Sequence, residues 1–159
     1  MAQARAGTIA RYLTITCTQG SADAFVQGSV DTGIIPEQGL GLRVISIEFA
    51  IATAMAAVSA DFEIVWSLTR DTKIAPASYN DDDCILFDGI SGSLTTSGQI
   101  VLPYRRQYSP VEGVFLVEPT IYGSLDSTAT GLTMTGYWRI YYEEVAMTEV
   151  DILRVLNNS

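Results

Sequence analysis

The sequence predicts an all-β protein, a sandwich of about eight antiparallel strands that ends in one short C-terminal helix. Short runs alternate apolar and polar residues along the chain, and clusters of Gly, Pro, Asn, Asp and Ser separate these runs. No crossover helix is predicted between the runs, which argues against a parallel sheet. The 159 residues suffice for one core, so we expect a single domain over residues 1–159, with its core at 8–146.

Eight segments carry the period-two pattern of a half-buried strand. They span residues 8–18, 24–31, 42–53, 61–69, 84–87, 99–104, 111–122 and 131–146. Trp66 and Trp138 fall on the inner rows of the fourth and the last segment. The expected inner row of the third consists of Ile45, Ile47, Phe49 and Ile51. We therefore predict an eight-stranded antiparallel jelly-roll sandwich, although strand number alone leaves immunoglobulin-like and lectin sandwiches open.

Helix is expected only at the C-terminus. Thr148 is a suitable N-cap and Asp151 occupies the N3 position of a capping box, which predicts a helix over residues 148–156. Its apolar residues are too many for a helix free in solvent, so we expect it to dock on its own sandwich or on a partner. The alanine-rich residues 50–60 favour helix intrinsically, but the alternation upstream predicts a strand followed by a turn.

The charge balance excludes several classes of function. The chain has 9 Lys plus Arg against 18 Asp plus Glu, a net charge of −9, and Lys73 is its only lysine. These cations are too few for a protein that binds nucleic acid through many phosphates. Histidine is absent, which excludes histidine-dependent triads, histidine metal sites and imidazole acid–base catalysis. We expect no enzymatic activity and no cofactor.

The acidic run at residues 80–83 is the one candidate for a metal site. Asp81 and Asp83 are possible Ca²⁺ ligands, but the sixth residue counted from Asp81 is Leu86, where an EF-hand requires glycine. Charge runs usually face water, so we expect no metal. Cys17 and Cys84 are expected to be free thiols, with a disulfide between them left open.

The N-terminal residues lack the apolar stretch of a secretory signal. Glu48 interrupts the most apolar window, residues 44–60, which therefore reads as a buried strand and not as a membrane span. We expect synthesis in the cytoplasm without a signal peptide, and no transmembrane segment.

Tyrosine and arginine gather at two places, and these residue types are enriched where proteins contact each other. We predict an assembly interface that combines both groups with the apolar tail. Its members are Tyr137, Arg139, Tyr141, Tyr104, Arg105, Arg106, Tyr108, Ile152, Leu153 and Leu156. Each Tyr–Arg group can equally be a solvated corner or ordinary cross-strand packing on a sheet face.

From residue 8 to residue 146 the strand pattern, the Thr-, Ser- and Gly-rich connections and the long final strand resemble the single jelly-roll capsid proteins of viruses. The resemblance is architectural, and no signature motif carries it. It implies a structural subunit of a virion that assembles with copies of itself and with other capsid proteins. Many such proteins begin with a long basic arm, whereas only Arg5 and Arg11 stand here. The departure argues against strong direct binding of nucleic acid and leaves a minor or decoration role open.

The competing interpretation is a carbohydrate-binding sandwich. In it, Trp66 or Trp138 and the tyrosines near Arg105 stack on a sugar, and Ca²⁺ binds at the Asp81 loop. Both tryptophans fall on predicted inner rows, which favours the shell subunit.

Overall fold

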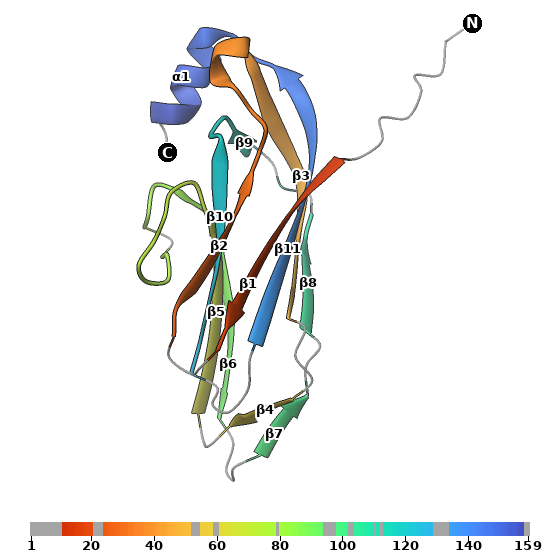
Figure 1. Ribbon diagram of the computed structural model, residues 1–159, viewed down its shortest axis with the longest axis vertical. Coiled ribbons are helices and arrows are strands. Elements are labelled where there is room, and N and C mark those ends of the chain that lie inside the picture. Colours follow the sequence, from red (N-terminus) through yellow and green to blue (C-terminus); the bar gives the residue numbers. More distant parts are fainter. Residues whose placement is uncertain are drawn as a thin grey trace, which may run out of the picture.

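The computed structural model describes residues 11–20, 24–51, 55–58, 61–78, 80–93, 98–101, 104–109, 111, 113–128 and 134–157. Within them, two antiparallel sheets lie face to face (Figure 1). Sheet A contains β1 (Arg11–Gln19), β11 (Met134–Ala146), β3 (Leu40–Ile51) and β8 (Tyr104–Tyr108) in that order, with β9 (Phe115–Leu116) also on β3. Sheet B contains β2 (Val26–Asp31), β10 (Thr120–Ser127), β5 (Asp61–Thr69) and β6 (Cys84–Ser93).

The pairing of the strands is that of a jelly roll. β1 pairs with β11, β2 with β10, β3 with β8, and β5 with β6, and every pair is antiparallel. Early strands therefore pair with late ones, as in one long hairpin rolled up so that both sheets receive strands from each half. The β11–β3 and β10–β5 pairs complete the sheets. The predicted antiparallel jelly-roll sandwich is confirmed, and so is its short C-terminal helix, α1 (Glu149–Asn157).

Several strand boundaries differ from the predicted ones. The predicted strand 99–104 is divided between β7 (Gly98–Val101) and β8, and 111–122 is divided between β9 and β10. Within the alanine-rich stretch, residues Met55–Val58 form the strand β4. This strand pairs with β7 in a separate two-stranded sheet, which lies at the opposite end of the sandwich from α1 (Figure 1). The predicted ends at residues 8, 53 and 131 lie outside the described residues.

A β-bulge in β3 changes the expected inner row. The pairing with β11 shifts register between Tyr141 and Tyr142, and Ile45 is left without a partner in β11. As a result the side chain of Ile45 is 39% exposed, and Val44 takes its place in the core. The prediction for Ile45 is therefore wrong, whereas the other three residues of that row are buried.

Three aromatic rings fill the centre of the sandwich. The rings of Phe49 in sheet A and Trp66 in sheet B are stacked, with centroids 4.5 Å apart and an interplanar angle of 15°. Trp138 of β11 packs against Phe49 at 4.8 Å and 52°. All three side chains are 0% exposed, which confirms the predicted inner positions of both tryptophans.

Both cysteines are free thiols. Burial raises the pKa of Cys17 to about 12, and it also raises the pKa of Cys84. Both thiols therefore stay protonated near neutral pH, which makes them poor nucleophiles.

Glycine allows the two sheets to meet at one edge. A Cβ atom on Gly28 of β2 would lie 2.3 Å from the backbone oxygen of Thr16 in β1, so only glycine fits there without movement of the backbone. This contact closes the sandwich where β1 and β2 are the edge strands of their sheets.

We predict that Gly28→Ala lowers the free energy of unfolding by about 1–3 kcal/mol, because β1 and β2 must separate. Urea denaturation followed by tryptophan fluorescence measures the change. The control is Gly20→Ala, where the added Cβ meets no atom within 4 Å. Equal stability of the two variants would show that the edge is not closely packed.

Candidate assembly surfaces

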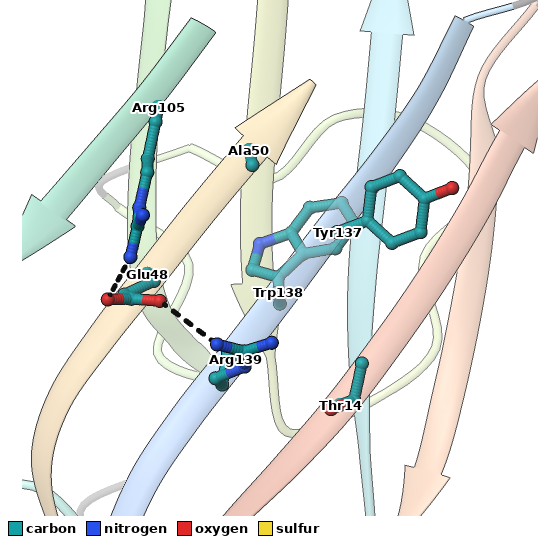
Figure 2. Close-up of a pocket in the computed structure, with 7 residues that line it drawn as sticks. All are labelled: Thr14, Glu48, Ala50, Arg105, Tyr137, Trp138 and Arg139. Carbon is teal, nitrogen blue, oxygen red and sulfur yellow. Dashed lines mark hydrogen bonds and ion pairs between the residues drawn. The ribbon is translucent and has the colours of Figure 1, made fainter. Parts of the chain in front are cut away.

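Glu48 organises the outer face of sheet A (Figure 2). Its carboxylate accepts a hydrogen bond from Arg105 at 2.7 Å and lies 3.8 Å from the guanidinium of Arg139. The Glu48 side chain is only 13% exposed, whereas those of Arg105 and Arg139 are 66% and 47% exposed. Two guanidinium groups therefore share one sunken carboxylate, and this part of an acidic chain carries a net positive charge.

Tyrosine rings hold the outer guanidinium in place. Arg139 lies 5.0 Å from the centroid of the Tyr12 ring and donates a hydrogen bond to the Tyr141 hydroxyl at 3.5 Å. The hydroxyl of Tyr141 in turn donates to Glu48 at 3.4 Å. The side chains of Tyr12 and Tyr137 are 55% and 40% exposed. Because the network already orders these groups, a partner that binds here immobilises few side chains.

A depression of about 290 Å³ lies between these side chains. It is lined by Thr14, Glu48, Ala50, Arg105, Tyr137, Trp138 and Arg139 (Figure 2). The small side chain of Ala50 leaves the space open, while the arginines and Tyr137 form its rim. Such a site offers hydrogen-bond donors, an aromatic ring and positive charge, and it suits recognition of a side chain from another protein.

The second predicted group, on β8, is divided between the two sides of the strand. Arg105 lies opposite Ala50 on the outer face. Tyr104 and Tyr108 are partly buried and pack against the core. Tyr104, Tyr108 and Arg106 all have partners within the subunit. Their place in an assembly interface stays a prediction.

The partners of Tyr108 connect the two sheets. Its hydroxyl donates a hydrogen bond to Asp88 of β6 at 2.6 Å and accepts one from the indole nitrogen of Trp66 in β5 at 3.0 Å. Arg106 forms an ion pair with the same Asp88 at 2.9 Å. Burial, followed by the bond to Asp88, raises the pKa of Tyr108 well above its ordinary value, so the hydroxyl remains a donor.

The roles of two carboxylates were not predicted from the sequence. Glu48 interrupts an apolar window there, and Asp88 follows directly after the predicted strand 84–87. The available signal was the alternation of β6, which places Asp88 on the inner side between Leu86 and Ile90. A carboxylate on an inner row requires partners, because an unpaired buried charge is costly.

We predict that Tyr108→Phe lowers the free energy of unfolding by about 1–3 kcal/mol, since it leaves the Trp66 indole N–H buried without an acceptor. Tyr137→Phe is the matched control, because its hydroxyl makes no hydrogen bond among the described residues and its ring is 40% exposed. Thermal or urea unfolding of both variants gives the comparison. A loss of equal size in both would contradict the sheet-connecting role of Tyr108.

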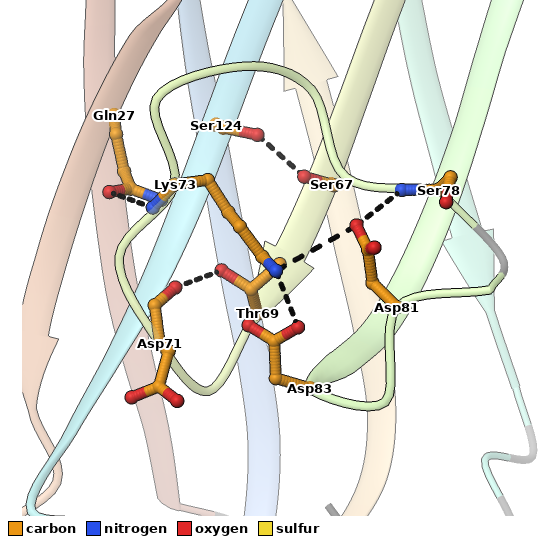
Figure 3. A network of polar contacts seen from close by, with 9 residues as sticks. All are labelled: Gln27, Ser67, Thr69, Asp71, Lys73, Ser78, Asp81, Asp83 and Ser124. Carbon is orange, nitrogen blue, oxygen red and sulfur yellow. Dashed lines mark hydrogen bonds and ion pairs between the residues drawn. The ribbon is translucent and has the colours of Figure 1, made fainter.

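The loop between β5 and β6 covers part of the outer face of sheet B (Figure 3). Beneath it, the hydroxyls of Ser67 and Ser124 are 2.6 Å apart and both residues are buried. Ala77 of the loop is 2% exposed. The backbone N–H of Lys73 donates to the side chain of Gln27 in β2 at 3.2 Å. The loop is thereby fixed to the sheet, and one of its residues, Ile74, is 99% exposed.

Lys73 takes the position that a cation would need in the acidic run. Its ammonium nitrogen lies 2.6 Å from Asp83 and 3.7 Å from Asp81 (Figure 3). The bond to Asp83 raises the pKa of Lys73, so the ammonium stays charged. Within the described ranges, no three His, Cys, Asp or Glu residues gather as a metal site would require.

The C-terminal helix has the predicted cap. The Thr148 hydroxyl donates to the Asp151 carboxylate at 2.6 Å, and the Asp151 N–H donates to Thr148 Oγ1 at 3.2 Å. The bonds that the Thr148 hydroxyl and backbone N–H donate to the Asp151 carboxylate lower the pKa of Asp151. Just before the helix, the Met147 N–H donates to the carbonyl of Gly39 at 2.8 Å, which ties α1 to the turn before β3.

Apolar side chains lie on two sides of α1. Ile152 is 7% exposed, so its own subunit covers it. Val150 and Leu153 lie away from Ile152 on the helix and are 58% and 50% exposed, whereas Leu156, one turn after Ile152 on the same face, is 43% exposed. A hollow of about 470 Å³ lies between the helix and the preceding turn and is lined by Glu37, Gly39, Glu149, Ile152 and Leu153.

No helix in the described part of the chain has the length and apolar character needed to cross a bilayer.

No family model matches the chain, and no curated protein matches it. Among solved structures, it is similar to a chain from the naturally occurring empty particles, or top component, of cowpea mosaic virus. The identity is 10%, the coverage is 91% of this chain and 89% of that chain, and the TM-score is 0.41. A chain of desmodium yellow mottle tymovirus has 10% identity, with 94% of this chain and 97% of that chain covered and a TM-score of 0.30. The chain is thus similar to these virus chains in overall architecture alone, without a family signature.

Proposed function

We propose that this chain is a structural subunit of a viral capsid, which assembles with copies of itself and with companion proteins and catalyses no reaction. The observation that carries the proposal is the second apolar side of α1. Ile152 already anchors the helix to its own sandwich, yet Val150 and Leu153 remain half exposed or more. A helix that is apolar on opposite sides is normally buried on both, which calls for a partner.

The outer face of sheet A supplies a second contact surface, at a different place on the molecule. Its exposed tyrosines and guanidinium groups are of the types that dominate binding energy between proteins. A stable interface buries roughly 1,200 Å² or more in total, which is within the reach of a whole sheet face. Two separate surfaces let one subunit contact more than one neighbour, as a closed shell requires.

The charges support the view that the subunit does not itself bind nucleic acid strongly. Every lysine and arginine in the described ranges has a carboxylate within ion-pair distance. A phosphate would have to compete with these carboxylates for each cation. We accordingly propose that this subunit is part of a virion in which another component neutralises the charge of the genome.

The carbohydrate-binding alternative depends on groups that the fold uses otherwise. Trp66 and Trp138 are 0% exposed, so neither ring is open to a sugar. Lys73 stands between Asp81 and Asp83, where Ca²⁺ would have to bind. No contact in the described residues favours this alternative over the shell subunit.

We predict that truncation after Met147 leaves a folded chain that does not assemble, because the outward side of α1 is lost. Near-ultraviolet circular dichroism reports the packing of the tryptophans, and sedimentation velocity reports assembly. Val150→Ser with Leu153→Ser should abolish assembly in the same way, without removing Ile152 from its site. Arg154→Ser, at a 75% exposed side chain of the same helix, is the control.

If the chain truncated after Met147 unfolds instead, the prediction is wrong, because α1 would then be part of the core of its own subunit. Normal assembly of the Val150→Ser, Leu153→Ser variant would equally remove α1 from the contact surfaces.

We predict that Tyr137→Ala with Arg139→Ala weakens association by more than about 1–2 kcal/mol, which is roughly a tenfold rise in the concentration needed for assembly. Light scattering over a concentration series measures it. Ser29→Ala with Ser91→Ala, at exposed positions of sheet B, is the control pair. Unchanged assembly of the first variant would exclude this face as an energetic centre.

A further inference from the structure

Ile74 is an apolar side chain that the fold holds in water. It is 99% exposed, the highest value among the exposed large hydrophobic residues of the described chain. Burial of a large aliphatic side chain lowers the free energy. Because Ile74 is fully exposed in the monomer, a partner that buried it would gain this free energy on binding.

The loop around Ile74 is already fixed before any partner arrives. The side chain of the adjacent Lys73 is held by Asp83 at 2.6 Å, and its backbone N–H is held by Gln27 at 3.2 Å (Figure 3). Thr69 donates to the carbonyl of Asp71 at 2.8 Å. A partner that receives Ile74 therefore orders little of the chain, which favours tight association.

We propose that Ile74 inserts into the depression on the outer face of sheet A of a second copy of this chain, with Asp71 approaching the guanidinium groups of Arg105 and Arg139. This inference rests on the proposed assembly of copies and names one of its contacts. The depression of about 290 Å³ has room for the side chain, because truncation of one buried leucine leaves a cavity of only about 150 Å³.

Charge favours this depression over the hollow beside α1 and the hollow beneath the loop. Asp71 is exposed and has no ion pair among the described residues, so the loop presents a negative charge three residues from Ile74. The hollow beside α1 carries Glu37 and Glu149, which would repel the loop. The hollow of about 670 Å³ beneath the loop is lined by the acidic run of residues 80–83 and by Arg70 and Lys73, which carboxylates already pair. In the depression on sheet A two guanidinium groups share one carboxylate, so its rim keeps a net positive charge.

The two halves of this contact lie on opposite faces of the sandwich. The loop covers the outer face of sheet B, and the depression lies on the outer face of sheet A. Contacts between different patches join copies head to tail, and they close into rings or shells when the rotation between copies permits.

Disulfide trapping tests the contact directly. Chains with Ile74→Cys are mixed with chains that carry Ala50→Cys, and the mixture is oxidised mildly. Cysteine is a small apolar side chain, so it retains part of the contact. Both populations also carry Cys84→Ser, because Cys84 is only partly buried, whereas Cys17 is buried. We expect a covalent dimer from the mixture and none from either population alone. Absence of the mixed dimer from a chain that does assemble would overturn this inference and leave the capsid proposal standing.

A charge exchange provides the second arm. Asp71→Arg and Arg105→Glu should each weaken association about tenfold, and the double variant should recover part of the loss, since positions 71 and 105 would again carry opposite charges while Arg139 is unchanged. Asp82→Arg is the matched control, an exposed carboxylate of the same loop farther from Ile74. Equal effects of Asp71→Arg and Asp82→Arg, with no recovery in the double variant, would contradict the contact. A mixed dimer without larger particles would support the contact and refute the shell, and a monomer that never cross-links would refute both.

Discussion

The stack of Phe49 on Trp66, with Trp138 against it, is the interaction on which the rest of the structure depends. The rings join sheet A to sheet B at the centre of the core, and each aromatic side chain buries roughly 150–250 Å². Successive side chains of a strand point to opposite faces. With Phe49 and Trp138 held inward, their neighbours Glu48 and Arg139 must point outward. The chemistry of the outer face is therefore a consequence of the core.

The same core also explains why the β8 edge is rigid. The indole nitrogen of Trp66 would be buried without a partner if Tyr108 did not accept its hydrogen. Tyr108 in turn needs Asp88, and Asp88 needs Arg106. This chain of requirements connects the edge strands of the two sheets, and it gives two of the predicted interface residues, Tyr108 and Arg106, partners within the subunit.

The two outer faces differ in what they offer a partner. On sheet B, the loop between β5 and β6 covers Ser67, Thr69 and Ser124, and its only lysine pairs with two carboxylates of the same loop. On sheet A, no loop of the described residues covers the outer face over Glu48, whose two arginine partners are exposed. An acidic chain repels its own copies at long range, so contacts are most favourable where the local charge is positive or absent. Sheet A meets this condition at Glu48 and its two arginines, whereas the outward side of α1 offers apolar side chains close to the acidic residues Glu149 and Asp151.

Period-two alternation was sufficient to predict the sandwich, because it places Trp66 and Trp138 inward whatever the order of the strands. It could not predict the bulge at Ile45, since a one-residue shift in pairing leaves no mark on the alternation itself. The capping box of Thr148 and Asp151 is a local signal and was found. The ion pairs of Glu48 join strands distant in sequence, so only the folded chain brings them together. Those of Lys73 lie within one loop, where no periodic pattern marks them. Ile74 was passed over because the loop around it is polar.

Electron micrographs of the purified full chain at physiological ionic strength test the central claim most directly. A protein that exists to associate with copies of itself should form closed particles or rings of uniform size under these conditions. A field without particles, together with sedimentation as a single monomeric species at high concentration, would contradict the account.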